Sequence, residues 1–102
     1  MNERIKCLIP KIQEYMKTKP IIRAWLFGSY SRGEESPESD IDILVDYDRT
    51  QGNFSLFTMG GILMELSELL GNQVDLVDNR GLMQFARESV DHDKILIYER
   101  EN

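Results

Sequence analysis

The sequence has a single cysteine, Cys7, among 102 residues. One cysteine cannot form an intrachain disulfide or a multi-cysteine zinc or iron–sulfur site, so we expect a cytoplasmic setting. No apolar run approaches the ~18 residues that a membrane-spanning helix needs. The N-terminal segment also lacks the uninterrupted apolar core of a signal peptide. These absences predict a soluble protein that neither spans a membrane nor is exported.

Basic residues are also scarce, because 12 Lys and Arg stand against 18 Asp and Glu, which gives a net charge of -6. Affinity for nucleic acid depends on neutralising phosphates, so broad nucleic-acid binding is disfavoured. Hydrophobic residues make up 41% of the chain and charged residues 29%, as in ordinary globular proteins. The length predicts that residues 1–102 form one domain, without a separate substrate-recognition domain.

Apolar residues recur with spacings that predict alternating helices and strands. Helical spacing predicts helices over residues 3–17, 55–70 and 82–90. Pro10 should kink or restart the first helix, and Gly71 should end the second. Strand patterns cover residues 21–27, 41–46, 74–77 and 94–98, and a turn or short helix with a loop covers 29–39. This order predicts an α/β (α+β) domain with a small mixed sheet of about four strands and helices mainly on one side.

Aspartates stand at the start of one predicted strand and inside another. Asp40 and Asp42 are two residues apart, so their side chains should point to one face, roughly 6 to 7 Å apart. Asp75 lies between Val74 and Leu76 and should project away from the face that these two bury. If the two strands are neighbours, the three carboxylates can converge at one site.

Three converging carboxylates repel one another unless a positive charge compensates them. Mg²⁺ is the natural compensator, and two such ions can clamp a triphosphate during in-line displacement. Gly28 and Ser29 follow a strand and offer backbone N–H groups and a hydroxyl to phosphate. Taken alone, Ser29 would more often be a helix N-cap, and it could serve both purposes. Arg32 adds a fork-shaped cation for phosphate. The chemistry indicated is phosphoryl or nucleotidyl transfer.

Other interpretations of these motifs fit less well. Gly28 to Gly33 has the glycine spacing of a Walker A loop, but Glu34 and Glu35 stand where that loop needs Lys and Ser or Thr. An EF-hand would need an oxygen ligand at Leu44. The aspartates could also form a solvated strand edge, which would not explain their shared faces. We leave three further acids and one histidine off the site, as solvated or loop residues: Asp46, Asp48, Asp78 and His92.

Aromatic and apolar residues are expected mainly in the core. Packing is the default for four aromatics on predicted core faces: Trp25, Phe27, Phe57 and Phe85. Tyr30 is expected as an exposed turn residue that could flank a nucleotide or contact a partner. In the helix over 55–70 the expected inward face is Leu56, Met59, Leu63, Leu66 and Leu70. Residues such as Met59, Leu63 and Met64 are alternatively a partner or homodimer surface.

The spacing of these motifs resembles a known family. Gly28-Ser29, ten residues, then Asp40-Ile41-Asp42 is similar to the signature of the DNA polymerase beta-like nucleotidyltransferase superfamily, and Val74-Asp75-Leu76-Val77 resembles the strand with its third acid. The stretch from Phe27 to Val45 resembles the minimal nucleotidyltransferase branch. The resemblance implies a palm-like nucleotidyltransferase fold. It also implies that Asp40, Asp42 and Asp75 are catalytic metal ligands.

By the same resemblance, Gly28, Ser29 and Arg32 would bind the triphosphate, and AMP would pass from ATP to an acceptor hydroxyl with two Mg²⁺. The branch implies MntA-type antitoxins that act on a HEPN-domain toxin. Two alternatives stay open. The first is a non-catalytic module that masks a HEPN ribonuclease toxin by binding it. The second is nucleotidylation of a small acceptor such as an aminoglycoside, which at this length would need a second subunit.

Overall fold

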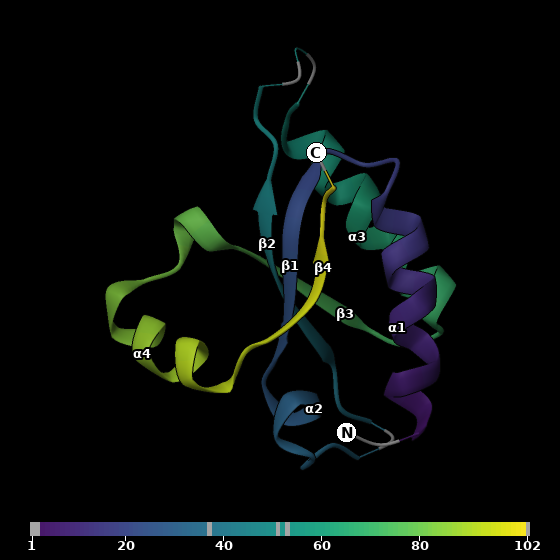
Figure 1. Cartoon of the computed structure of the whole chain (residues 1–102), viewed down its shortest axis with the longest axis vertical. Coiled ribbons are helices and arrows are strands. Elements are labelled where there is room, and N and C mark those ends of the chain that lie inside the picture. The colour runs from purple at the N-terminus through teal and green to yellow at the C-terminus, as the bar shows by residue number, and fades with distance from the viewer. Residues whose placement is uncertain (1–2, 37, 51, 53, 102) are drawn as a thin grey trace.

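The computed structural model describes residues 3–36, 38–50, 52 and 54–101. Helices and strands alternate as predicted (Figure 1). The elements in chain order are α1 (Glu3–Met16), β1 (Ile21–Phe27), α2 (Ser29–Arg32), β2 (Ile41–Tyr47), α3 (Leu56–Leu70), β3 (Val74–Asp78), the 3-10 turn η1 (Asn79–Gly81), α4 (Gln84–Asp93) and β4 (Ile95–Glu99).

The four strands form one sheet in the order β3-β2-β1-β4. Strand β1 pairs antiparallel with both β2 and β4, whereas β2 and β3 are parallel. A parallel pair needs a crossover connection, which α3 supplies between β2 and β3. The mixed four-stranded sheet is therefore confirmed. The predicted neighbourhood of the two aspartate-bearing strands is confirmed as well.

The hydrophobic core lies between one face of the sheet and the helices α1 and α3 (Figure 1). Helix α1 buries Ile5, Leu8, Ile12 and Met16 at helical spacing, and the helix continues through Pro10 without interruption. The strands bury alternate residues against this layer, as Ile41, Ile43 and Val45 do in β2. The prediction of helices mainly on one side is confirmed, while α4 lies across the sheet from them.

The predicted inward face of α3 is partly wrong. Ile62, Leu66 and Leu70 are buried, whereas Leu56 is 81% exposed and Leu63 is 36% exposed. Leu56 and Leu63 are seven residues apart and so share nearly one helical direction, about 20° apart. The side of α3 that packs against the sheet is the i, i+4 row of Ile62, Leu66 and Leu70, and Leu56 and Leu63 lie at the edge of that side.

Three of the five aromatic positions assessed from the sequence differ from expectation. Phe57 and Phe85 were predicted in the core but are 92% and 84% exposed. Tyr30 was expected as an exposed turn residue but is buried in the core, where its hydroxyl accepts hydrogen bonds from Arg4 and Asn72. Spacing alone cannot reveal which helix face meets the sheet, and the two Phe side chains lie on the other faces of α3 and α4.

Helix termini follow local chemistry more closely. Ser55 caps α3 by accepting from the Thr58 backbone, and Gly71 ends it at φ 65°, as predicted. Helix α4 begins later than predicted and ends at Asp93, so His92 is an exposed helical residue and not a loop residue. Polar residues on a solvated helix face give no periodic signal. No helix in the described part of the chain has the length and apolar character to cross a membrane.

Candidate functional site

The aspartates of β2 and β3 meet in one row across the sheet. Asp42 is paired in register with Phe27 of β1 on one side and with Asp75 of β3 on the other. Cross-strand partners share a face, so these side chains project to the side away from α1 and α3. Asp40 precedes β2 by one residue and is exposed, as is Asp75, whereas Asp42 is half-buried. The register therefore places Asp42 next to Asp75, as the predicted convergence of the three acids requires.

The electrostatics of Asp42 reflect this crowding. Burial is the largest cause that raises its pKa, followed by the negative charges of Asp75 and Asp40, and the pKa reaches about 6. The Arg32 guanidinium acts in the opposite direction and lowers it. A carboxylate whose ionisation is opposed in this way is stabilised by a cation placed among the three acids.

Gly28 brings the backbone directly against the Asp42 carboxylate. Its φ is 74°, and a Cβ added there would lie 2.3 Å from Asp42 Oδ2. The φ and the contact each favour glycine, and together they fix the loop after β1 beside the acids. The Gly28 carbonyl accepts hydrogen bonds from the backbone N–H groups of Ser31 and Arg32, which closes the turn.

Ser29 and Arg32 lie at the two ends of the short helix α2. Gly28 occupies the N-cap position and Ser29 is the first helical residue, so the N-cap alternative for Ser29 is wrong. Arg32 Nε donates to Glu34 Oε1 at 2.8 Å, and Arg32 Nη1 donates to Asp93 Oδ2 at 2.7 Å. Arg32 is therefore paired with two carboxylates, while its charge also acts on Asp42 and lowers the pKa of that residue.

The three acids have the donor chemistry that Mg²⁺ prefers, since all their oxygens are hard carboxylate ligands. The half-buried Asp42, whose charge is opposed by Asp75 and Asp40, fits a divalent cation at this position. Within the ranges that the structure describes, no three acidic, His or Cys side chains are already gathered closely enough to hold an ion. Binding would therefore require the Asp40 and Asp75 carboxylates to approach Asp42 more closely.

The acids left off the site lie elsewhere and have protein partners. Asp46 pairs with Arg23 and accepts from Asn79. Asp48 pairs with Arg100 at 2.8 Å, and Asp78 pairs with Arg49. These contacts join the far ends of the strands and account for the three acids without any ligand.

Sequence reasoning missed Asp93, which contacts Arg32 from α4. Its side chain is only 15% exposed, and Arg32 and then His92 hold its pKa below the usual range. Nothing in the sequence indicates this contact, because Asp93 belongs to a polar run that resembles a loop. Only the path of α4 back toward the sheet brings it to α2.

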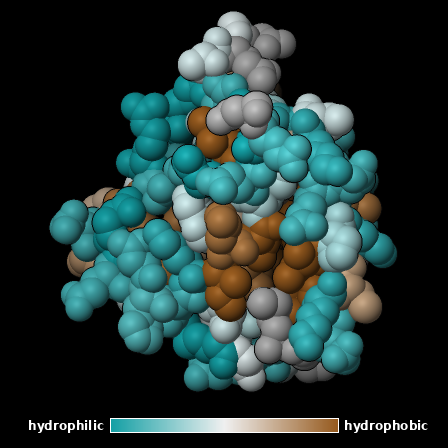
Figure 2. Space-filling view, in the orientation of Figure 1, coloured by the Kyte–Doolittle hydropathy of each residue, from teal (hydrophilic) through white to brown (hydrophobic). Residues whose placement is uncertain are grey.

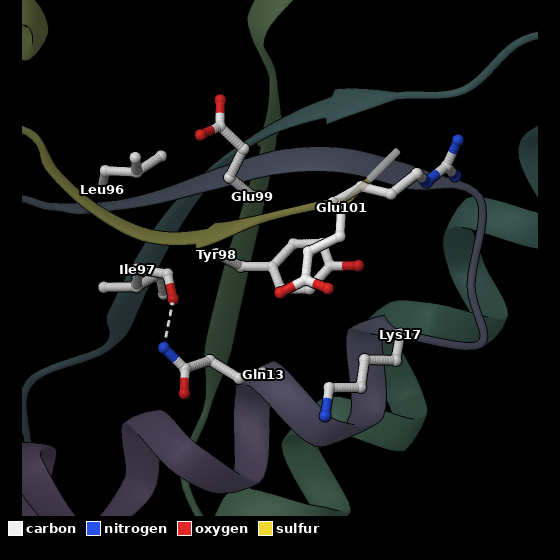
Figure 3. A pocket seen from close by; sticks show the side chains of 8 residues that line it. Gln13, Lys17, Leu96, Ile97, Tyr98, Glu99 and Glu101 are labelled. Atoms are coloured by element: carbon white, nitrogen blue, oxygen red, sulfur yellow. Dashed lines mark hydrogen bonds between the residues drawn. The ribbon is translucent and has the colours of Figure 1, made fainter.

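A groove lies away from the acids, between α1 and β4 (Figure 3). It measures about 530 Å³, and Gln13 crosses it to donate a hydrogen bond to the Ile97 carbonyl at 2.8 Å. Figure 2 shows exposed hydrophobic residues in a central strip of this side of the molecule, surrounded by hydrophilic surface. The groove shares no residue with the acidic row.

Comparison with known proteins gives consistent matches. The family model described as "Polymerase beta, Nucleotidyltransferase" matches residues 10–102. A Methanocaldococcus jannaschii protein with the provisional name protein adenylyltransferase is 35% identical over 96 residues, 91% of this chain and 94% of that protein. A solved structure described as a minimal nucleotidyltransferase has a TM-score of 0.76 at 30% identity and covers 91% of this chain and 92% of its own.

A further match comes from a toxin–antitoxin complex. The structure of a tri-AMPylated Shewanella oneidensis HEPN toxin with an MNT antitoxin contains a chain with a TM-score of 0.66 at 25% identity. The match covers 92% of this chain and 71% of that one. The matches agree with the resemblance that the motif spacing indicates.

Proposed function

The chain belongs to the polymerase beta nucleotidyltransferase family, and we propose that it transfers AMP from ATP to an acceptor hydroxyl on a HEPN-domain toxin, acting as its antitoxin. The observation that carries this proposal is the Asp42 position, paired with Asp75 and pressed against Gly28. The AMPylated toxin in the complex of the Shewanella oneidensis protein supports the acceptor class.

In this proposal one domain supplies the whole site. Asp40, Asp42 and Asp75 would hold Mg²⁺, which when bound would neutralise the triphosphate and lower the pKa of the acceptor hydroxyl. Gly28 and Ser29 bind the β and γ phosphates through backbone N–H groups and the Ser29 hydroxyl, and Arg32 adds charge-assisted hydrogen bonds. The open face of the sheet leaves room for a protein acceptor.

The chain's own groups then guide the transfer. The Asp75 carboxylate takes the proton of the acceptor hydroxyl, whose oxygen attacks the α phosphorus. The bond from the α phosphorus to the bridging oxygen breaks, and pyrophosphate leaves with that oxygen. Arg32 stabilises the charge that develops on the leaving phosphates. The products are an AMP-modified hydroxyl and pyrophosphate.

The test is transfer of label from α-³²P-ATP with Mg²⁺ to the purified protein encoded by the neighbouring reading frame. We expect label on that protein with wild type and none with the Asp40→Asn, Asp42→Asn double variant. The matched control is Asp46→Asn, which removes a charge from the same strand and should transfer normally. A stable complex without transfer would instead favour a non-catalytic, masking antitoxin, and transfer only to small hydroxyl compounds would reject the protein acceptor.

A further inference from the structure

Arg32 is the polar link between the phosphate loop and α4. It extends from α2 to Asp93 in the last turn of α4, at 2.7 Å. In the described part of the chain this is the only hydrogen bond between these two helices. Helix α4 otherwise depends on one buried side chain, Val90, and on Arg87, which donates to the Asn79 carbonyl. The C-terminal end of α4 continues into β4, which begins at Ile95 and pairs with β1, and Asp93 adds the polar contact between this end and Arg32.

An aspartate at this place needs a reason, because the C-terminus of a helix carries partial negative charge and disfavours acids. The last turn of α4 contains two, Asp91 and Asp93. Asp91 pairs with Lys94, three residues further along the chain, at 2.8 Å, which is a local contact within one turn. Asp93 instead pairs over 61 positions with Arg32 and is largely covered. The Arg32–Asp93 pair thus connects α4 to α2 and does not stabilise α4 locally.

The Arg32 guanidinium is fixed on two of its three nitrogens. Glu34 accepts from Nε and Asp93 accepts from Nη1, while Nη2 has no hydrogen-bond partner among the described residues. A planar guanidinium held at two nitrogens has a fixed plane, so the third points in a defined direction. Such a group loses little freedom when it then binds phosphate. Glu34 is the weaker anchor because its side chain is 64% exposed.

We propose that Asp93 is a positioning residue that holds Arg32 beside Asp42, oriented to bind the β and γ phosphates of the nucleotide. This inference rests on the proposed function, since Arg32 must meet a triphosphate. It assigns α4 a role in the site although no α4 residue touches substrate. A carboxylate that merely competed with phosphate for Arg32 would have the opposite effect on affinity.

The experiment measures binding of a non-hydrolysable ATP analogue and of AMP, both with Mg²⁺, by titration calorimetry. Asp93→Ala should weaken the ATP analogue about tenfold, as loss of a supporting contact typically does. AMP affinity should not change, because AMP lacks the phosphates that Arg32 meets. Asp93→Asn retains an acceptor oxygen and should lose less. Asp91→Ala is the matched control in the same helix turn and should bind as wild type does.

A double-mutant cycle shows whether Asp93 acts through Arg32. In an Arg32→Ala background, Asp93→Ala should cause no further loss of analogue affinity. Additive losses, an equal loss for AMP, or tighter analogue binding by Asp93→Ala would each overturn the proposal. Should the Ala variant fail to fold, the same cycle with Asp93→Asn decides, with a loss of several-fold expected. A wild type that binds no analogue would reject the proposed function instead.

Discussion

The two faces of the sheet are built on different principles. On the α1 and α3 side, alternate strand residues and two amphipathic helices bury a continuous apolar core. The opposite side carries the acidic row and is covered in part by α4, which buries only Val90. Stability is concentrated on one face, and the groups whose charges oppose each other lie on the other. The apolar core on one face of the sheet thus stabilises a fold whose other face carries an electrostatically unfavourable site.

Asp42→Asn should have the largest effect and should separate the two faces. We expect AMP transfer to fall about a thousandfold, because the variant removes one of the carboxylates proposed to hold the cation that neutralises the reacting phosphates. The free energy of unfolding should stay constant or rise, since repulsion from Asp75 is relieved. Label transfer and chemical denaturation measure the two effects. Transfer within tenfold of wild type would remove Asp42 from the reaction.

Leu66→Ala tests the core face. Leu66 is fully buried between α3 and the sheet, so we expect a loss of roughly 2 to 5 kcal/mol in the free energy of unfolding. Val90→Ala, on the α4 side, removes less buried surface and should cost roughly 1 to 2 kcal/mol. Urea denaturation compares them. Equal costs would contradict the contrast between the faces.

Gly28→Ala and Gly33→Ala form a matched pair. Both glycines have positive φ, 74° and 72°, so alanine should strain the backbone similarly, by about 1 kcal/mol. Only at Gly28 would the new Cβ meet Asp42, whereas Gly33 has open space. We expect transfer to fall by about a hundredfold for Gly28→Ala alone, because the carboxylate must move. A similar fall in both variants would indicate backbone strain as the cause.

The pH dependence should show the smallest effect. In the folded protein the pKa of Asp42 is about 6, above the ordinary 3.8. The contribution of Asp42 to the free energy of unfolding is therefore fully present below pH 4 and is lost as the pH rises through 6. Solvent screening of this half-buried group reduces the loss to roughly 1 kcal/mol. Denaturation of metal-free protein at pH 4 and 7 should show that the free energy of unfolding declines less in Asp42→Asn than in wild type. An identical decline would assign the effect to other groups.

Much of the fold was predictable because it depends on local patterns. The strand over 21–27 and the cap at Gly71 follow from short-range periodicity and backbone chemistry, and both are confirmed. The exposure of Phe57 and the start of α4 were predicted wrongly. Those features depend on which helix face meets the sheet, and spacing defines faces only relative to one another.

The sequence by itself determined which residues are candidates: the Gly28-Ser29 pair, the Asp40 and Asp42 spacing, and Asp75 in an apolar strand. Side-chain alternation and the chemistry of carboxylates suffice for that inference. Only the tertiary structure decided that Asp42 and Asp75 share a register and that Asp93 reaches Arg32. Pairing between strands and the return of α4 are long-range events, and their energy comes from burying apolar surface that no local motif records.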